Sequence, residues 1–162
     1  MNYHNITKDD MLNGDGLRVV LWVAGCNHNC FNCQNPETHS PISGIEFDSE
    51  AIKEIFEELD KDYIQGLTLS GGDPLYPDNR ATMCKLCREI KNKYPKKDIW
   101  LYTGYKWEDI KDLEIMQFVD ALVDGEFIQN LADENYKWAG STNQRVIDVK
   151  KSLKLDKIIL HE

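Results

Sequence analysis

The sequence predicts an α/β fold with a parallel sheet. Short apolar runs rich in β-branched residues alternate with segments in which apolar residues recur every three or four positions. This alternation implies parallel strands, right-handed crossovers and a functional site at the carboxyl ends of the strands. Only three helices alternate with strands, which is too few for a closed eightfold barrel. We therefore expect a truncated α/β barrel of parallel strands, open on one side, as one domain over residues 1–162.

The first half of the chain predicts two strands, a long loop and a helix. Residues 17–24 (LRVVLWVA) form an apolar run bounded by glycines, which is typical of a strand buried on both faces. Residues 25–44 are polar and lack periodicity, so they predict one long loop, and loops of that length are usually functional. Asp48 can cap a helix, and residues 67–70 predict the next strand. The buried stripe of that helix consists of Ile52, Ile55, Phe56 and Leu59.

The second half predicts two more helices, each followed by a strand. One apolar stripe consists of Met83, Leu86, Cys87, Ile90 and Tyr94, and a shorter one of Trp107, Ile110 and Leu113. Residues 99–103 and 119–124 predict the accompanying strands. After Gly125 a polar stretch extends to Asn143, and residues 145–149 and 157–160 predict strands that complete the sheet.

Composition excludes several classes of protein. Hydrophobic residues make up 41% of the chain and charged residues 29%, and no apolar run approaches the roughly 20 residues of a membrane span. The first twenty residues lack the features of a secretory signal, so we expect a cytoplasmic protein. The net charge is -9 with scattered basic residues, which argues against a nucleic-acid partner.

Three of the five cysteines predict a metal centre. Cys26, Cys30 and Cys33 lie four and three residues apart in the polar loop that follows the first strand. In a reducing compartment such clustered thiols are typical metal ligands. A 4Fe-4S cluster is usually held by four cysteines, so three would leave one iron open for another ligand. The alternative is a closed zinc site with His28 or His39 as fourth ligand, in a binding module without catalysis.

The other two cysteines have a structural interpretation. Cys84 and Cys87 have the Cys-x-x-Cys spacing of a redox pair. However, both lie in a predicted helix, and Cys87 belongs to its apolar stripe, which favours packing in the core.

A glycine pair follows the strand at residues 67–70. In Ser70-Gly71-Gly72-Asp73-Pro74 the two glycines would let bare backbone approach a ligand, although a tight turn explains them equally well. The cysteine triad followed by this Gly-Gly-Asp-Pro resembles the radical S-adenosylmethionine enzymes. The segments VAGCNHNCFNCQNPET, LTLSGGDPLYP, IWLYTGY, LVDGEFI and GSTNQRVIDV are similar to the activating proteins of anaerobic ribonucleoside-triphosphate reductase, and the resemblance covers residues 2–149.

The resemblance implies a specific chemistry. In that family the open iron binds the methionine part of S-adenosylmethionine, and one electron from the cluster cleaves a carbon–sulfur bond to methionine and a 5′-deoxyadenosyl radical. The radical then removes a hydrogen atom from a glycine of the reductase, and a flavodoxin-like protein is the expected electron donor. A glycine of a formate-lyase-type enzyme is the alternative target.

The resemblance also implies which residues bind S-adenosylmethionine. Gly71, Gly72 and Asp73 match the motif whose backbone receives the amino group. The backbone of Asn32, Cys33 and Gln34 should run beside the adenine.

Two further groups of residues stay open as candidates. Thr103 and Asp124 end strands at the expected catalytic edge and could bind the ribose, but polar residues at strand ends often only form caps or turns. An aromatic group could form a partner-docking patch or pack in the core, and it consists of Tyr102, Tyr105, Trp107 and Trp138.

Overall fold

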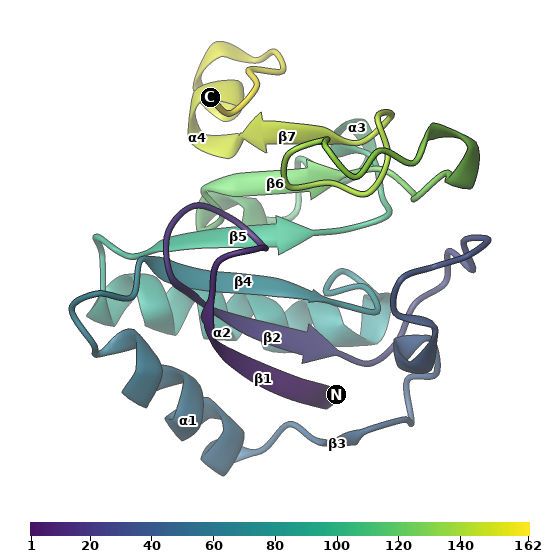
Figure 1. Ribbon diagram of the computed structural model, residues 1–162. Coiled ribbons are helices and arrows are strands. Elements are labelled where there is room, and N and C mark those ends of the chain that lie inside the picture. Colours follow the sequence, from purple (N-terminus) through teal and green to yellow (C-terminus); the bar gives the residue numbers. More distant parts are fainter.

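A computed structural model describes all 162 residues and contains one seven-stranded sheet with helices between its strands (Figure 1). The strands are β1 (Asn2–Asp10), β2 (Arg18–Val23), β3 (Ile45–Glu46), β4 (Gly66–Gly71), β5 (Asp98–Tyr102), β6 (Ala121–Asp124) and β7 (Arg145–Asp148). The helices are α1 (Ser49–Leu59), α2 (Arg80–Lys93), α3 (Trp107–Ile110) and α4 (Val149–Leu155). The order of the strands in the sheet is β3-β1-β2-β4-β5-β6-β7.

The centre of the sheet is parallel and its flanks are antiparallel. Strands β2, β4, β5 and β6 run in the same direction, whereas β1 and β3 on one side and β7 on the other are antiparallel to their neighbours. The sheet is therefore mixed, which differs from the expected sheet of parallel strands. The four parallel strands still bring their carboxyl ends to one edge.

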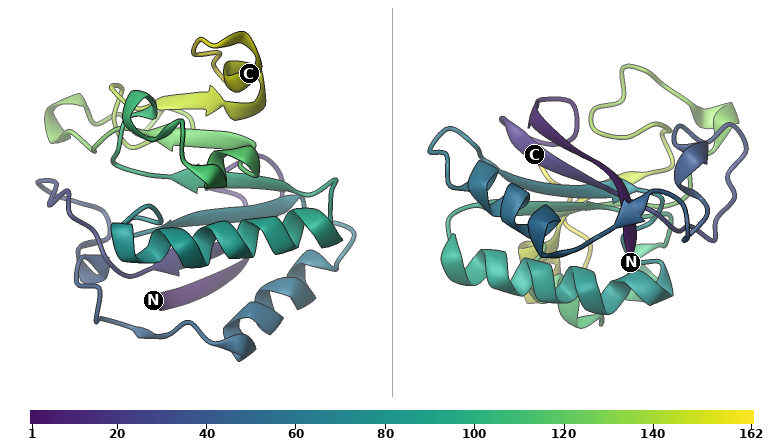
Figure 2. Two further views of the ribbon diagram at one scale, coloured as in Figure 1. Left: turned by 180° about the vertical axis from the view of Figure 1, so that it is seen from behind. Right: turned by 90° about the horizontal axis from the view of Figure 1, so that it is seen from below.

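The two faces of the sheet have different environments. Helices α1 and α2 cover the same face, as the view from below in Figure 2 shows. Alternate residues such as Leu21, Leu69 and Leu101 pack there in the main hydrophobic core. The opposite, helix-free face carries Trp100 and Val123 in a smaller buried cluster, against which Trp138 packs. On this second face, loops rather than helices cover the sheet.

The predicted helices are present, with one clear difference in length. The Asp48 side chain caps α1 by accepting a hydrogen bond of 3.0 Å from Ala51 N. The stripe of α2 is buried as predicted, except that the helix ends at Lys93. The third helix is only four residues long and is followed by a 3-10 turn, Glu114–Gln117. None of the helices is long and apolar enough to cross a membrane.

Three elements near the ends of the chain differ from the predictions. Strand β1 was not predicted because its polar sequence shows no regular alternation. Bulges shift its register against β2, so its buried positions are irregularly spaced. Residues 149–155 form α4, which is capped by Asp148. The predicted strand at 157–160 is wrong, because only Leu160 makes an isolated bridge, to Ile147. Two backbone hydrogen bonds accompany this bridge, from Asp148 N to Ile159 O at 2.8 Å and from His161 N to Val146 O at 2.8 Å, so the segment touches β7 without forming a strand.

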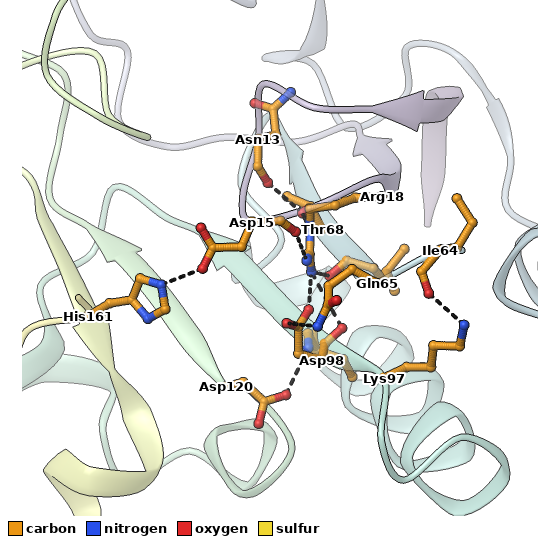
Figure 3. Close-up of polar contacts among 12 residues, drawn as sticks. Asn13, Asp15, Arg18, Ile64, Gln65, Thr68, Lys97, Asp98, Asp120 and His161 are labelled. Atoms are coloured by element: carbon orange, nitrogen blue, oxygen red, sulfur yellow. Dashed lines mark hydrogen bonds and ion pairs between the residues drawn. The ribbon is translucent and has the colours of Figure 1, made fainter. Parts of the chain in front are cut away.

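Arg18 is fully buried on the helix-free face and holds the loop at residues 10–16 against the sheet (Figure 3). It donates hydrogen bonds to Thr68 Oγ1 at 2.8 Å, Asp15 O at 2.8 Å and Leu67 O at 3.0 Å. Its Nη2 is also ion-paired with Asp98 Oδ1 at 2.5 Å. The guanidinium therefore has a partner in each direction, as a buried charge requires.

We expect Arg18→Lys to lower the free energy of unfolding by about 2–4 kcal/mol, because one ammonium cannot satisfy this set of partners. Urea denaturation measures the loss. The control is Arg88→Lys, whose partner Glu114 is exposed, and it should change stability by less than about 1 kcal/mol. Equal stability of the two variants would contradict the assigned role of Arg18.

Candidate functional site

The cysteine loop is attached to the carboxyl edge of the parallel strands. At its base, Gly25 N donates to Thr38 O at 2.8 Å and Cys26 N donates to His39 O at 3.0 Å. Asp73 N donates to Gly25 O at 2.7 Å, which joins this base to the segment after β4. The three cysteines therefore lie on a loop whose two ends are fixed at the edge of the sheet.

Two asparagines with left-handed backbone conformations shape the cysteine loop. Asn29 and Asn32 have φ values of 54° and 55°, in the left-handed region that asparagine tolerates better than most residues. Each immediately precedes a cysteine, Cys30 or Cys33. Asn32 thus has a backbone role, although it does not line the cavity described below.

The three thiols line one cavity of about 630 Å³ at this edge. Backbone N–H groups approach two of the sulfurs, since His28 N lies 3.5 Å from Cys26 Sγ and Asn35 N lies 3.4 Å from Cys33 Sγ. Hydrogen bonds of this kind favour the thiolate and tune iron–sulfur clusters. The cavity also contains Gln34, Ser70, Gly71, Gly72, Thr103 and Gly104 in its wall. Most of the predicted binding residues are therefore brought together.

Asp73 lies outside the cavity wall and has a supporting position. Its buried carboxylate accepts hydrogen bonds from His28 Nε2 at 2.6 Å, Thr103 Oγ1 at 2.9 Å, Gly104 N at 3.0 Å and Leu75 N at 2.8 Å. It therefore joins the cysteine loop to the ends of β4 and β5. Because the carboxylate oxygens already accept these hydrogen bonds, a contact of Asp73 with the cofactor stays a prediction for its backbone alone.

His28 is the residue of the cysteine loop that sequence reasoning undervalued. Besides Asp73, its Nδ1 contacts Glu126 Oε1 at 3.2 Å, and its ring packs edge-on against Tyr105. The hydrogen bond to Asp73 raises the pKa of His28. A Cβ atom at Gly104 would lie 2.5 Å from the imidazole, so only glycine fits beside it. The sequence signal was a histidine between two cysteines, which does not reveal such distant partners.

The glycine pair has a reason in the fold itself. Gly71 has φ of +104°, and a Cβ there would lie 2.5 Å from Val23 N; a Cβ at Gly72 would lie 2.5 Å from Gly25 O. The glycines therefore allow the end of β4 to contact the backbone of β2 and the cysteine loop. The Gly72 carbonyl accepts no hydrogen bond from the protein, so it remains available to a ligand amino group.

The two candidates at strand ends, Thr103 and Asp124, have different positions relative to the cavity. The Thr103 hydroxyl lines the cavity but already donates to Asp73 and accepts from Tyr105 N at 3.2 Å. Asp124 is buried, accepts from Trp107 N at 2.8 Å and pairs with Arg145. It therefore caps α3, as the structural alternative predicts. Of the aromatic group, Tyr102 and Trp138 line the cavity, whereas Tyr105 and Trp107 pack against the main core.

The donor set fits a cluster better than a single ion. Nowhere do three His, Cys, Asp or Glu side chains converge closely enough to hold one metal ion. A mononuclear zinc site requires such convergence. Both ring nitrogens of His28 already have partners, and His39, whose Nε2 has none, does not line the cavity of the three thiols. In a cubane each thiolate binds a different iron, so the three sulfurs need to line one space without meeting at a point.

Burial makes two of the thiols, those of Cys26 and Cys30, weaker acids, which predicts a pH dependence of cluster assembly. It raises the pKa of Cys26 to about 11, and it also raises that of Cys30. Metal binds thiolate, so each unit of pH above 7 should increase the reactive fraction about tenfold. We expect anaerobic iron and sulfide uptake to be faster at pH 8.5 than at pH 7, followed by visible absorption. A rate that does not change with pH would contradict this expectation.

A loop of three thiols beside a cavity, at the carboxyl edge of parallel strands, is an arrangement suited to an iron–sulfur protein with one cluster. Residues 12–147 match the model of a family described as a 4Fe-4S single cluster domain. This match supports an iron–sulfur cofactor.

Curated relatives share most of their length with this chain. A protein of Enterobacteria phage T4 is 49% identical over 146 residues, which are 90% of this chain and 93% of the relative. Proteins of Vibrio cholerae (42% over 148 residues, 89% and 96%) and Escherichia coli K12 (41% over 150 residues, 90% and 97%) are also similar. All three are named anaerobic ribonucleoside-triphosphate reductase-activating protein. The chain belongs to this family.

Proposed function

We propose that this protein activates an anaerobic ribonucleoside-triphosphate reductase by forming a glycyl radical on it, with S-adenosylmethionine and a 4Fe-4S cluster held by Cys26, Cys30 and Cys33. The observation that carries the proposal is that these thiols and the backbone of Gly71 and Gly72 line one cavity. The names of the relatives support this reductase over a formate-lyase-type target.

The residues of the chain have the task of positioning and shielding. When bound, the reduced cluster and S-adenosylmethionine supply a 5′-deoxyadenosyl radical, which no side chain can provide. The three thiolates would hold the cluster and leave one iron for the methionine end, and the Gly72 carbonyl, which has no protein donor, would accept a hydrogen bond from its amino group. The backbone of Cys33 and Gln34, whose residues line the same cavity, would run beside the adenine. Asp73 and His28 hold the loop against the sheet.

The proposal includes an interpretation of the fold. The four parallel strands and their helices would correspond to a shortened, open barrel of the radical S-adenosylmethionine type. Strand residues also line the cavity, but much of its border on the helix-free face consists of loops, with residues from 11–13, 26–35 and 134–140. An opening between these loops would admit a protein segment.

The test combines three measurements on anaerobically purified, reconstituted protein. It should contain four irons per chain by analysis, cleave S-adenosylmethionine to 5′-deoxyadenosine after reduction by flavodoxin, and give the reductase a glycyl radical in spin resonance. A formate-lyase-type enzyme treated in the same way should stay without radical. Zinc as the only bound metal, or a radical on the lyase alone, would refute the proposal.

A further inference from the structure

The segment that follows β6, residues 125–127, lies against the cysteine loop. Figure 1 shows both on the side to which the arrowheads of the parallel strands point, and both line the cavity. The Glu126 carboxylate contacts His28 Nδ1 at 3.2 Å. Burial raises the pKa of Cys30, and a backbone hydrogen bond from Phe127 to its sulfur opposes this effect. The segment therefore meets the cysteine loop at one side chain and at one predicted iron ligand.

The backbone of segment 125–127 receives little support from the sheet. Strand β6 ends at Asp124, and Gly125 has φ of +94°, in the region that favours glycine. One backbone hydrogen bond fixes the start of the segment, from Gly125 N to Tyr105 O at 3.0 Å. The carbonyl oxygens of Gly125 and Glu126 accept no hydrogen bond from the backbone. The position of these two residues therefore depends on side chains.

Two side-chain amides supply the missing hydrogen bonds. Asn143 Nδ2 donates to Glu126 O at 2.8 Å. Gln144 Nε2 donates to Gly125 O at 3.0 Å. Both residues belong to the turn before β7, in which Gln144 N donates to Ser141 O at 3.1 Å. The turn thus holds two consecutive carbonyls of the segment that lies against the cysteine loop.

The turn is itself fixed on several sides. Gln144 Oε1 accepts from Gly140 N at 2.9 Å and from Ser141 N at 3.0 Å. The Tyr136 hydroxyl donates to Gln144 O at 2.6 Å. The next residue, Arg145, pairs with Asp124 in the sheet. Because both ends of the Gln144 amide are bound, the side chain keeps one conformation and transfers the position of the turn to segment 125–127.

We propose that Asn143 and Gln144 are positioning residues for the iron–sulfur cluster. Their amides hold segment 125–127, which contacts His28 and donates to the Cys30 sulfur. An N–H group at a ligand sulfur favours the reduced cluster, because that state carries one more negative charge. The two amides therefore raise the reduction potential, although Asn143 does not line the cavity. The inference rests on the proposed function, because it requires Cys30 to bind the cluster.

The first test measures hydrogen exchange in the metal-free chain by nuclear magnetic resonance. Asn143→Ala removes the hydrogen bond to Glu126 O, and Gln144→Met removes the one to Gly125 O. Both residues are only partly buried, so the variants should stay folded. Exchange of the Phe127 N–H should become about tenfold faster in each, because one hydrogen bond that holds the segment is lost.

The second test measures the reduction potential of the reconstituted protein by spin resonance. At a fixed potential the ratio of reduced to oxidised cluster should fall about threefold in Asn143→Ala and in Gln144→Met, with the iron content unchanged. Neither substitution changes the charge of the chain, so a shift reports the hydrogen bonds. The matched control is Thr142→Ala, because Thr142 is an exposed neighbour in the same turn. It should match the wild type in both tests.

Three results would overturn the inference. They are an unchanged exchange rate of the Phe127 N–H, an unchanged reduction potential in both variants, and an equal shift in Thr142→Ala. Zinc as the only bound metal would overturn the proposed function and the role in the cluster with it. Unchanged exchange in a chain that binds four irons would overturn this inference alone.

Discussion

Cys30→Ser is expected to lower both the bound iron and the radical yield at least about a hundredfold, because serine cannot replace a thiolate on iron. The fold should persist, since Cys30 is only partly buried and the loop is fixed through Gly25 and Cys26 instead. Iron analysis, visible absorption and thermal unfolding of the same sample separate these effects.

The matched control is Cys84→Ala on α2. Cys84 is buried against the main core and does not line the cavity, so the variant should keep its iron and lose only about 1 kcal/mol of stability. If Cys30→Ser instead unfolded the chain and bound zinc were lost, the zinc-stabilised module would be the better description. If Cys84→Ala lost its iron, the assignment of ligands would be wrong.

Asp73→Asn is expected to lower the free energy of unfolding by about 3–5 kcal/mol. The buried carboxylate of Asp73 accepts hydrogen bonds from several donors, and the NH2 group of an asparagine amide would face one or more of these donors. The contact with His28 would be lost with it. We therefore expect faster hydrogen exchange of the cysteine loop and a lower iron content. Urea denaturation of the metal-free chain measures the stability directly.

Asp78→Asn provides the comparison, since Asp78 is an exposed neighbour in the same segment. It should change stability by less than about 0.5 kcal/mol. An Asp73→Asn variant with full stability but weak S-adenosylmethionine binding would show that the carboxylate contacts the cofactor, contrary to the position found here.

Local patterns were sufficient to predict the centre of the fold. Periodicity located β2, β4, β5 and β6 and the helices α1 and α2, because these elements bury a regular stripe or an apolar run. The ends of the chain lack such patterns. Strand β1 is interrupted by bulges, and α4 has seven residues that offer too little periodicity to recognise. Pairing with distant neighbours decides these elements.

The candidate site divides in the same way. The spacing of Cys26, Cys30 and Cys33 suffices to predict a metal loop, since thiols this close in a polar segment have few other uses. The hydrogen bonds that Asp73 accepts from His28 and Thr103 were not predictable, because these partners lie 45 and 30 residues away in the chain.

The sequence by itself therefore predicted a metal loop, determined the order of the central strands and helices along the chain, and indicated the resemblance to a family. Only the tertiary structure decided that the flanks of the sheet are antiparallel and that the Asp73 carboxylate supports the cysteine loop. It also decided that Gly71 and Gly72 allow the end of β4 to contact the backbone of β2 and of the cysteine loop. The physical reason is the range of the interactions. Propensity and ligand spacing act over a few neighbouring residues, whereas burial and buried hydrogen bonds depend on which distant segments meet.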